Sequence, residues 1–217
     1  MLNIKSQSFK LVSLGIASGV LYSLWILGYF LNRSAFSHLD LSALQSRGQP
    51  YSSFFILGDI LTGIVVIWMA YSIRKVHSKG STLDTKSLKL CLIGLVAFGV
   101  FTAISCLLPS CIANSRSCDN SLSQLFDLHN VTGTIASVGL FVSLLNTPLI
   151  FRKKGLPQHL KAAISLLIVW SVSGLLFIFL SVDNQSSSIP TQKLFLVLSS
   201  ICLVVIPLLL TRSGIIE

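Results

Sequence analysis

The feature that most constrains this chain is a series of six apolar blocks, each about as long as a membrane-spanning helix. About 20 residues of α-helix are needed to cross the roughly 30 Å of hydrocarbon in a bilayer. Because lipid offers the backbone no hydrogen-bond partner, each block is expected to be helical. The sequence therefore predicts an all-α, polytopic transmembrane six-helix bundle, a single integral membrane domain over residues 1–217, with spans at about 11–31, 53–73, 88–108, 131–151, 160–182 and 191–211.

Composition excludes an ordinary water-soluble domain. Charged residues make up 11% of the chain and hydrophobic residues 53%, whereas soluble domains carry roughly 25% charged residues. A net charge of +9 in a soluble protein would suggest nucleic-acid binding. Here the basic residues gather at the ends of the spans, where anionic lipid head groups would attract them. We therefore expect the lipid bilayer as a partner, and no nucleic acid.

Lysine and arginine divide unequally between the two sides of the predicted bundle, and the side richer in them is expected to face the cytoplasm. That assignment predicts cytoplasmic termini, two longer outer loops, and a bacterial cytoplasmic (inner) membrane as the location. The first span is expected to be retained as a helix, because its apolar run is about twice that of a signal-peptide core. Four basic residues, Arg33, Arg47, Arg116 and Lys193, lie on the outer side, and the inner side holds the other 12, namely Lys5, Lys10, Arg74, Lys75, Lys79, Lys86, Lys89, Arg152, Lys153, Lys154, Lys161 and Arg212.

Glycine and proline mark positions of close packing or interruption. Gly15 and Gly19 form a G-x-x-x-G pattern on the first span, and Gly133 belongs to a small-residue face of the fourth. Such faces let helices approach closely, and packing inside the bundle is favoured here over dimerisation. Pro148 and Pro207 lie near the ends of the fourth and sixth spans, where each is expected to kink its helix or to end it.

Acidic residues gather on the outer side, where five of the seven lie. Asp59 is the most informative of them, because it lies within the second span, roughly 9 Å along the helix from its start. A carboxylate inside the membrane is costly and is a functional-site hypothesis by default. The alternative is a structural role, with Asp59 bonded to a neighbouring loop amide or to Arg47.

Two histidines accompany these carboxylates. His38 and Asp40 follow the first span, and Asp127 and His129 precede the fourth. If these helix ends meet, His38, Asp40, Asp59, Asp127 and His129 are candidate catalytic residues, suited to general acid–base chemistry or to binding a zinc-like ion. Their spacing matches no metal-binding signature, so metal and cofactor remain unknown. Structural hydrogen bonding is the alternative for each histidine.

The cysteines differ by location. Cys111 and Cys118 lie in the second outer loop, and a disulfide between them is the economical interpretation on an oxidising side of the membrane. Cys106 is a competing partner for Cys118. Cys91 and Cys202 lie within spans and are expected to be packing residues.

Several short motifs resemble one family. They are Ser-His-Leu-Asp-Leu-Ser-Ala-Leu (37–44), Gly-Gln-Pro (48–50) and Phe-Phe-Ile-Leu-Gly-Asp-Ile-Leu-Thr-Gly (54–63), then Leu-Leu-Pro (107–109) with His129 opening the fourth span. They resemble the membrane family called domain of unknown function 998. The aspartate that usually follows the family's second proline is replaced here by Ser110 and Cys111. The topology is more distantly similar to the Frag1/DRAM/Sfk1 group, of which some members are linked to lipid remodelling. The resemblance implies a six-span architecture more than an activity.

Two functions remain open. The preferred one is a structural, partner-binding or lipid-binding membrane module, in which the outer polar residues are structural. The alternative is an enzyme that acts on a lipid or lipid-linked substrate at the outer leaflet through the His/Asp cluster, with a lipid head group bound at the outer face. A transporter is disfavoured, because few charged residues occur within the spans.

Overall fold

The computed structural model describes residues 2–38, 41–46, 49–77, 85–108, 127–183 and 185–215. Throughout these residues the regular structure is helical, which confirms the all-α prediction. Six of the helical segments are long and apolar enough to cross a membrane, as predicted. The elements are α1 (Leu2–Tyr22), η1 (Leu24–Leu27), α2 (Gly28–Leu31), α3 (Arg33–His38), η2 (Leu41–Gln45), α4 (Ser52–His77), α5 (Thr85–Ser105), α7 (Leu128–Lys153), α8 (Pro157–Asp183) and α9 (Gln185–Arg212).

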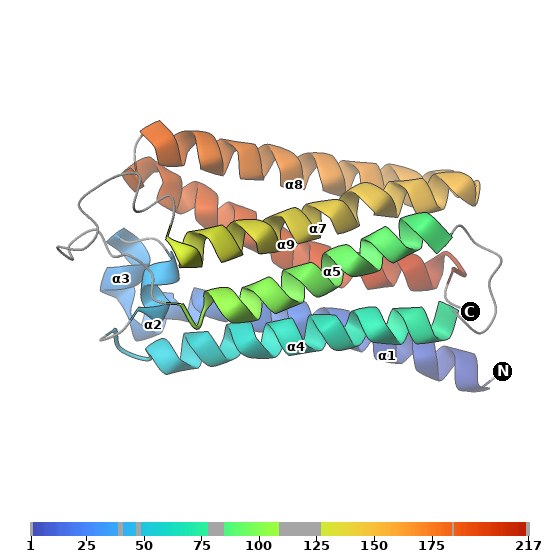
Figure 1. Cartoon of the computed structure of the whole chain (residues 1–217), viewed down its shortest axis with the longest axis horizontal. Coiled ribbons are helices and arrows are strands. Elements are labelled where there is room, and N and C mark those ends of the chain that lie inside the picture. Colours follow the sequence, from blue (N-terminus) through green and yellow to red (C-terminus); the bar gives the residue numbers. More distant parts are fainter. Residues whose placement is uncertain are drawn as a thin grey trace.

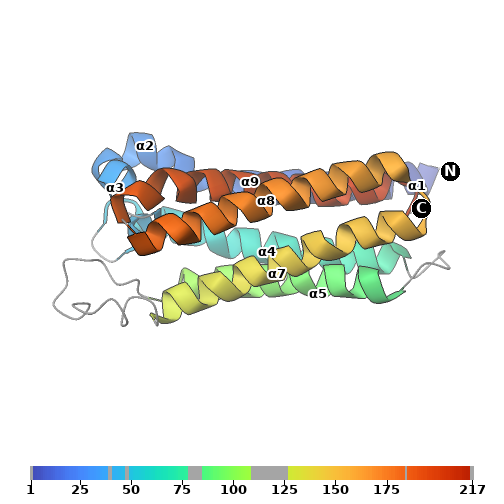
Figure 2. The ribbon, with the colours of Figure 1, turned by 90° about the horizontal axis from the view of Figure 1, so that it is seen from above.

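The long helices form a closed ring. Each packs against its neighbours in sequence, and α9 returns to pack against α1. The ring is flattened into two layers, with α1, α8 and α9 in one layer and α4, α5 and α7 in the other (Figure 2). Both termini lie at the same end of the bundle, called here the terminal end, and the short helices α2 and α3 lie at the opposite, capped end (Figure 1).

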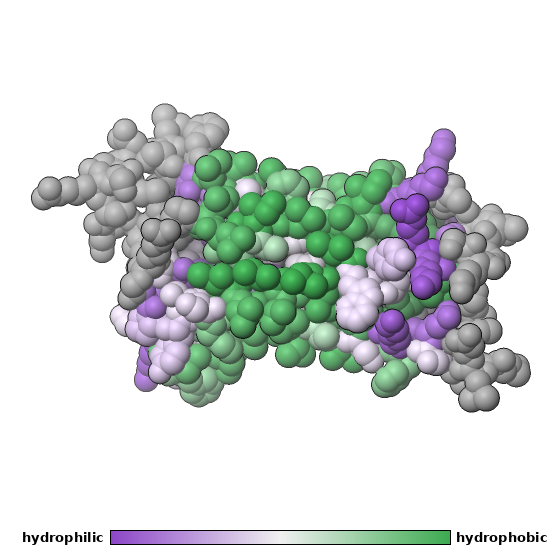
Figure 3. Space-filling model, turned by 60° about the horizontal axis from the view of Figure 1, so that its bottom comes forward, coloured by the Kyte–Doolittle hydropathy of each residue, from purple (hydrophilic) through white to green (hydrophobic). Residues whose placement is uncertain are grey.

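The outer surface of the ring is apolar over its middle. Large hydrophobic side chains such as Phe179 and Leu175 are 70% and 67% exposed, and the space-filling view shows a wide apolar band with polar residues towards each end (Figure 3). Such a surface is suited to lipid, because hydrocarbon does not penalise exposed apolar groups. These helices identify an integral membrane protein.

Glycines bring α5 into backbone contact with two neighbours. A Cβ added at Gly99 would lie 2.7 Å from the Gly63 carbonyl oxygen of α4, and one added at Gly139 of α7 would lie 2.8 Å from the Gly94 carbonyl oxygen. Each pair is reciprocal, so no larger residue fits on either side without moving a helix. Small residues have this role where membrane helices pack closely.

The first span departs from a single helix. Regular α-helix ends at Tyr22, and a 3-10 turn, η1, follows before α2. The Ser23 hydroxyl lies 2.8 Å from the Gly19 carbonyl oxygen, within its own helix, and 2.9 Å from Ser200 Oγ of α9. A serine that bonds back to the preceding turn bends a helix. The interruption therefore coincides with the point where α1 is fastened to α9.

The prolines do not end their helices. Pro148 lies inside α7 and Pro207 inside α9. A Cβ added at Gly15 would lie 2.5 Å from Pro207 Cγ, so the glycine leaves the space that the proline ring fills. The G-x-x-x-G face of α1 thus packs inside the bundle, as predicted. Gly133, by contrast, has open space where a Cβ would lie.

Candidate functional site at the capped end

The first loop forms a cap with its own small core. Ala35, Leu41, Leu44 and Phe55 are buried together, apart from the main core of the bundle. This cap is also bonded to α9. The Leu41 backbone N–H donates to Gln192 Oε1 at 2.9 Å, and Lys193 Nζ donates to the Phe36 carbonyl oxygen at 2.8 Å. The cap is therefore held at both its α4 and α9 edges.

Asp59 lies under this cap, on the second turn of α4. The side-chain amide of Gln45, on η2, donates to Asp59 Oδ2 at 2.5 Å. Gln45 is held there because Leu44, the residue before it, is completely buried. Of the alternatives for Asp59, the structure has the bond to a loop amide, whereas Arg47 lies outside the described residues.

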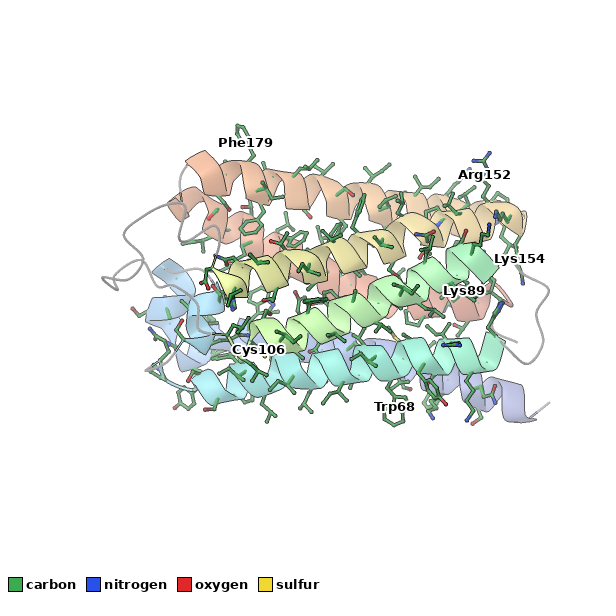
Figure 4. The ribbon with its side chains drawn as sticks, viewed as in Figure 1. Trp68, Lys89, Cys106, Arg152, Lys154 and Phe179 are labelled. Carbon is green, nitrogen blue, oxygen red and sulfur yellow. The ribbon has the colours of Figure 1, made fainter. Side chains whose placement is uncertain are left out.

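Two further polar side chains, Tyr22 at the end of α1 and Cys106 after the end of α5, lie towards the capped end of their spans. The Tyr22 ring packs edge-on against Phe98, with centroids 5.3 Å apart. Cys106 Sγ lies 3.1 Å from the Ala103 carbonyl oxygen and is a free thiol. The Asp59 carboxylate joins η2 to α4, and Cys106 lies at the capped end of the bundle in Figure 4.

His129 and Asp127 lie at the start of α7. The Asp127 side chain accepts a hydrogen bond from the His129 backbone N–H at 3.2 Å and so caps the helix. His129 is buried, and its Nδ1 lies 2.7 Å from the Ser105 carbonyl oxygen of α5. Because a carbonyl oxygen can only accept, Nδ1 carries the proton of this bond. The interaction caps the end of α5 from a neighbouring helix.

The five predicted site residues are thus brought together in part. Asp59 and His129 have different hydrogen-bond partners, Gln45 of the cap for Asp59 and the Ser105 carbonyl oxygen of α5 for His129. The side chains of His38 and Asp40 lie outside the described residues. Within the described part of the chain, no three His, Cys, Asp or Glu side chains gather as a metal site would require.

The predicted Cys111–Cys118 disulfide also falls outside the described residues, and its competitor Cys106 is unpaired. Cys91 and Cys202 are completely buried, in agreement with packing roles. The Cys91 thiol lies 3.2 Å from Ser143 Oγ, across the contact between α5 and α7.

The architecture agrees with the result of a comparison with protein-family models. The model of the family described as "Protein of unknown function (DUF998)" matches residues 15–211, which include all six spans almost completely. The chain belongs to the DUF998 family. Comparisons with curated proteins and with solved structures found no match. Membership in DUF998 therefore supports the predicted family and architecture, and an activity must be argued from the site itself.

The sequence did not predict the partners of Asp59 and His129. Gln45, Tyr22 and Ser105 carry no charge and belong to no motif, so nothing in the sequence separates them from other polar residues near span ends. One signal was available for Gln45. A carboxylate inside a span requires a donor, and the adjoining loop contains few side-chain amides.

Proposed function

We propose that this DUF998 protein is a non-enzymatic, lipid-binding membrane module whose polar residues fasten a cap over one end of the bundle. The roles of three of the candidate catalytic side chains support this proposal. Asp59 accepts from a cap amide, Asp127 caps a helix, and His129 binds a helix-end carbonyl. Each hydrogen bond satisfies a group that would be costly to leave unpaired in a low-dielectric interior.

The proposal of lipid binding rests on an apolar groove between α1 and α9. It is a shallow, largely open groove of about 480 Å³ beside the interruption of the first span, with Gly19, Ser23 and Ser200 where the two helices meet. Its remaining lining residues are apolar: Ile16, Val20, Leu24, Ile26, Leu27, Ile201 and Val204.

An acyl chain is the occupant that fits this groove. The groove lies within the spans, and its rim is formed by side chains exposed to the membrane, with Val20 59% and Ile16 48% exposed. The medium around such a rim is hydrocarbon. A lipid tail that fills the groove makes dispersion contacts that an empty groove would forfeit.

Substitution of Val20 by tryptophan tests the proposal, because the larger side chain would occupy the groove that Val20 lines. The matched control is Val172→Trp on α8, where the valine is similarly exposed, at 58%, but lies outside the groove. Protein is purified in mild detergent, and the retained lipid is quantified by mass spectrometry. We expect Val20→Trp to lose most of the lipid and Val172→Trp to retain it.

Equal lipid retention by the two variants would contradict the acyl-chain assignment. A second copy of the chain in the groove would also contradict it, and native mass spectrometry would detect this as a dimer that Val20→Trp dissociates.

For orientation, we propose that the terminal end faces the cytoplasm, in a bacterial cytoplasmic membrane. Lys89, Arg152 and Lys154 lie at that end in Figure 4, and lysine and arginine favour the cytoplasmic side. A green fluorescent protein fused to the C-terminus is expected to fluoresce, whereas a fused periplasmic alkaline phosphatase is expected to be inactive. The reverse pattern would overturn the orientation.

The alternative function, an enzyme acting on lipid or lipid-linked substrates at the outer leaflet, is favoured by one observation. The Asp59 carboxylate lies within a spanning helix and is bonded to a side-chain amide of the cap. If this group is catalytic, Asp59→Asn abolishes turnover of phospholipid in vesicles while the protein stays folded. If its role is structural, Asp59→Asn lowers thermal stability, and no turnover is lost because none occurs.

A further inference from the structure

The groove between α1 and α9 covers only one half of the first span. Its lining on that span runs from Ile16 to Leu27, and the span itself runs from Ser6 to Leu31. The groove is therefore roughly 17 Å long at 1.5 Å per residue, close to the roughly 15 Å that one leaflet contributes to the hydrocarbon core. Because Ile16 lies near the middle of the span and Leu27 near its capped end, the groove lies in the leaflet at the capped end.

An exposed aromatic pair continues the rim of the groove towards the membrane surface. Phe30 follows Ile26 of the groove by about one helical turn and is 77% exposed. The Tyr29 ring packs edge-on against Phe30, with centroids 5.2 Å apart, and is exposed as well. Tyrosine is enriched at the level of lipid head groups, because one end of it is apolar and the other is polar. A lipid whose chain fills the groove therefore has its head group beside α2.

Arg33 is the basic residue at this level. It begins α3, which lies at the capped end in Figure 1, and its side chain is exposed. It lies six residues beyond Leu27, roughly 9 Å at 1.5 Å per residue. The head-group region is about 5–8 Å thick on each side of a bilayer. With Leu27 at the edge of the hydrocarbon, Arg33 is therefore at the level of the phosphates.

The contacts of Arg33 leave its donors available to an anion. Its guanidinium carbon lies 5.3 Å from the centroid of the Tyr29 ring. Arginine stacks on aromatic faces and carries its five N–H donors in its own plane, in a fork that matches phosphate oxygens. The other described cation at this end, Lys193, donates instead to the Phe36 carbonyl oxygen within the cap.

The described carboxylates of the capped end act elsewhere. Asp59 accepts from Gln45, and Asp127 caps α7. The side chains of Asp40 and Asp183 lie outside the described residues.

We propose that the groove binds a phospholipid of the leaflet at the capped end, with its phosphate against the Arg33 guanidinium and one acyl chain running from Phe30 towards Ile16. The inference rests on the proposed function, since it takes an acyl chain as the occupant of the groove, and it adds the leaflet and the phosphate. A diacylglycerol would fill the same groove but would offer Arg33 no anion. Binding of the two lipids should therefore respond differently to a change of Arg33.

The first test titrates phosphatidylglycerol, and a diacylglycerol with the same acyl chains, against the detergent-solubilised full chain by native mass spectrometry. Arg33→Gln removes the guanidinium, and the matched control, Arg212→Gln, makes the same change of charge at an exposed arginine in the last turn of α9. A basic residue near an anionic head group contributes about fivefold to affinity. Arg33→Gln is therefore expected to weaken phosphatidylglycerol binding about fivefold and to leave diacylglycerol binding unchanged. Arg212→Gln is expected to stay within about twofold of the wild type for both lipids.

Equal losses in the two arginine variants would overturn the phosphate assignment, because they would show general attraction to a basic protein. Unchanged phosphatidylglycerol binding by folded Arg33→Gln would overturn it as well. Displacement of the lipid by excess inorganic phosphate would identify a soluble anion as the ligand of Arg33. Val20→Trp separates this inference from the proposed function: if that variant keeps its lipid, both fail, whereas its loss of lipid beside an unaffected Arg33→Gln refutes the phosphate assignment alone.

Photolabelling of the wild type tests the direction of the lipid without any variant that must fold. Phosphatidylglycerol carries a diazirine near either the carboxyl end or the methyl end of its acyl chain, and labelled peptides are identified by mass spectrometry. We expect the carboxyl-end probe to label Leu27 or Phe30 and the methyl-end probe to label Ile16 or Val204. The opposite order would place the head group in the other leaflet and would overturn the inference. Labelling of α8 as strong as that of the groove would refute the proposed function as well.

Discussion

Substitution of Gly94 by alanine tests the packing of α5 most directly. An added Cβ at this position would collide with the Gly139 carbonyl oxygen and would lie 2.7 Å from the Ser143 backbone nitrogen. Both obstacles are backbone atoms of α7, which no change of rotamer can move. To restore an ordinary contact of 3.4 Å to that nitrogen, α5 and α7 would have to separate by at least about 0.7 Å, and the closer carbonyl oxygen requires more, since such overpacking forces backbone shifts.

The same substitution at Gly133 is the matched control. Gly133 also lies within a spanning helix, but nothing is within 4 Å of its added Cβ. Both variants gain the helix propensity of alanine over glycine, about 1 kcal/mol. The difference between Gly94→Ala and Gly133→Ala therefore isolates the packing cost, which is expected to be about 1–3 kcal/mol.

The assay is unfolding of the purified protein by SDS from mild detergent, followed by circular dichroism. We expect Gly133→Ala to be as stable as the wild type or more stable, and Gly94→Ala to unfold at lower SDS. Gly94→Leu is expected to be worse than Gly94→Ala, because the helices must separate further. Equal stability of the two alanine variants would refute the inference that the Gly94–Gly139 contact sets the distance between α5 and α7.

Three further predictions concern the cap and the thiols. Gln45→Ala and Asp59→Ala are each expected to lower the free energy of unfolding by about 1–3 kcal/mol, and the double variant by less than their sum, because the two side chains share one hydrogen bond; additive losses would contradict this pairing. Gln192→Ala removes the acceptor of the cap's backbone bond to α9, so hydrogen exchange of residues 41–45 is expected to quicken, while exchange in the α5–α7 contact stays unchanged. Cys91 and Cys202 are expected to resist maleimide labelling in the folded protein and to react in SDS, since both are completely buried; rapid labelling of either before unfolding would contradict the packing described for it.

The sequence alone predicted the six spans and the all-α class, and the structure confirms both. Span prediction succeeds because a helix in lipid satisfies its own backbone, so the length and hydropathy of one segment are enough. Two boundaries differ from the prediction. The third helix ends at Ser105 instead of residue 108, and the first is interrupted after Tyr22. Each difference occurs where a side chain of another helix binds. His129 of α7 binds the end of α5, and Ser200 of α9 binds Ser23 at the interruption of the first span.

The candidate site was predicted only as a set of residues. Asp59 and His129 stood out because charged and imidazole groups are rare in spans, and both are buried or half-buried at the capped end. Their partners could not be predicted, since Gln45 and the Ser105 carbonyl reach them through tertiary packing. Pairing depends on which loop folds over which helix, and that information is not local in the chain.

What only the tertiary structure decided is which faces of the helices meet. In a soluble protein the buried face is the apolar one, but here the lipid-facing and core-facing sides are equally apolar, so hydropathy does not distinguish them. The sequence therefore marked Gly15, Gly19 and Gly133 alike as packing positions, and only the first two face another helix closely. The closure of α9 onto α1, and with it the groove between them, follows from those contacts. The number of spans is a property of each segment, whereas their arrangement is set by small residues that allow two backbones to touch.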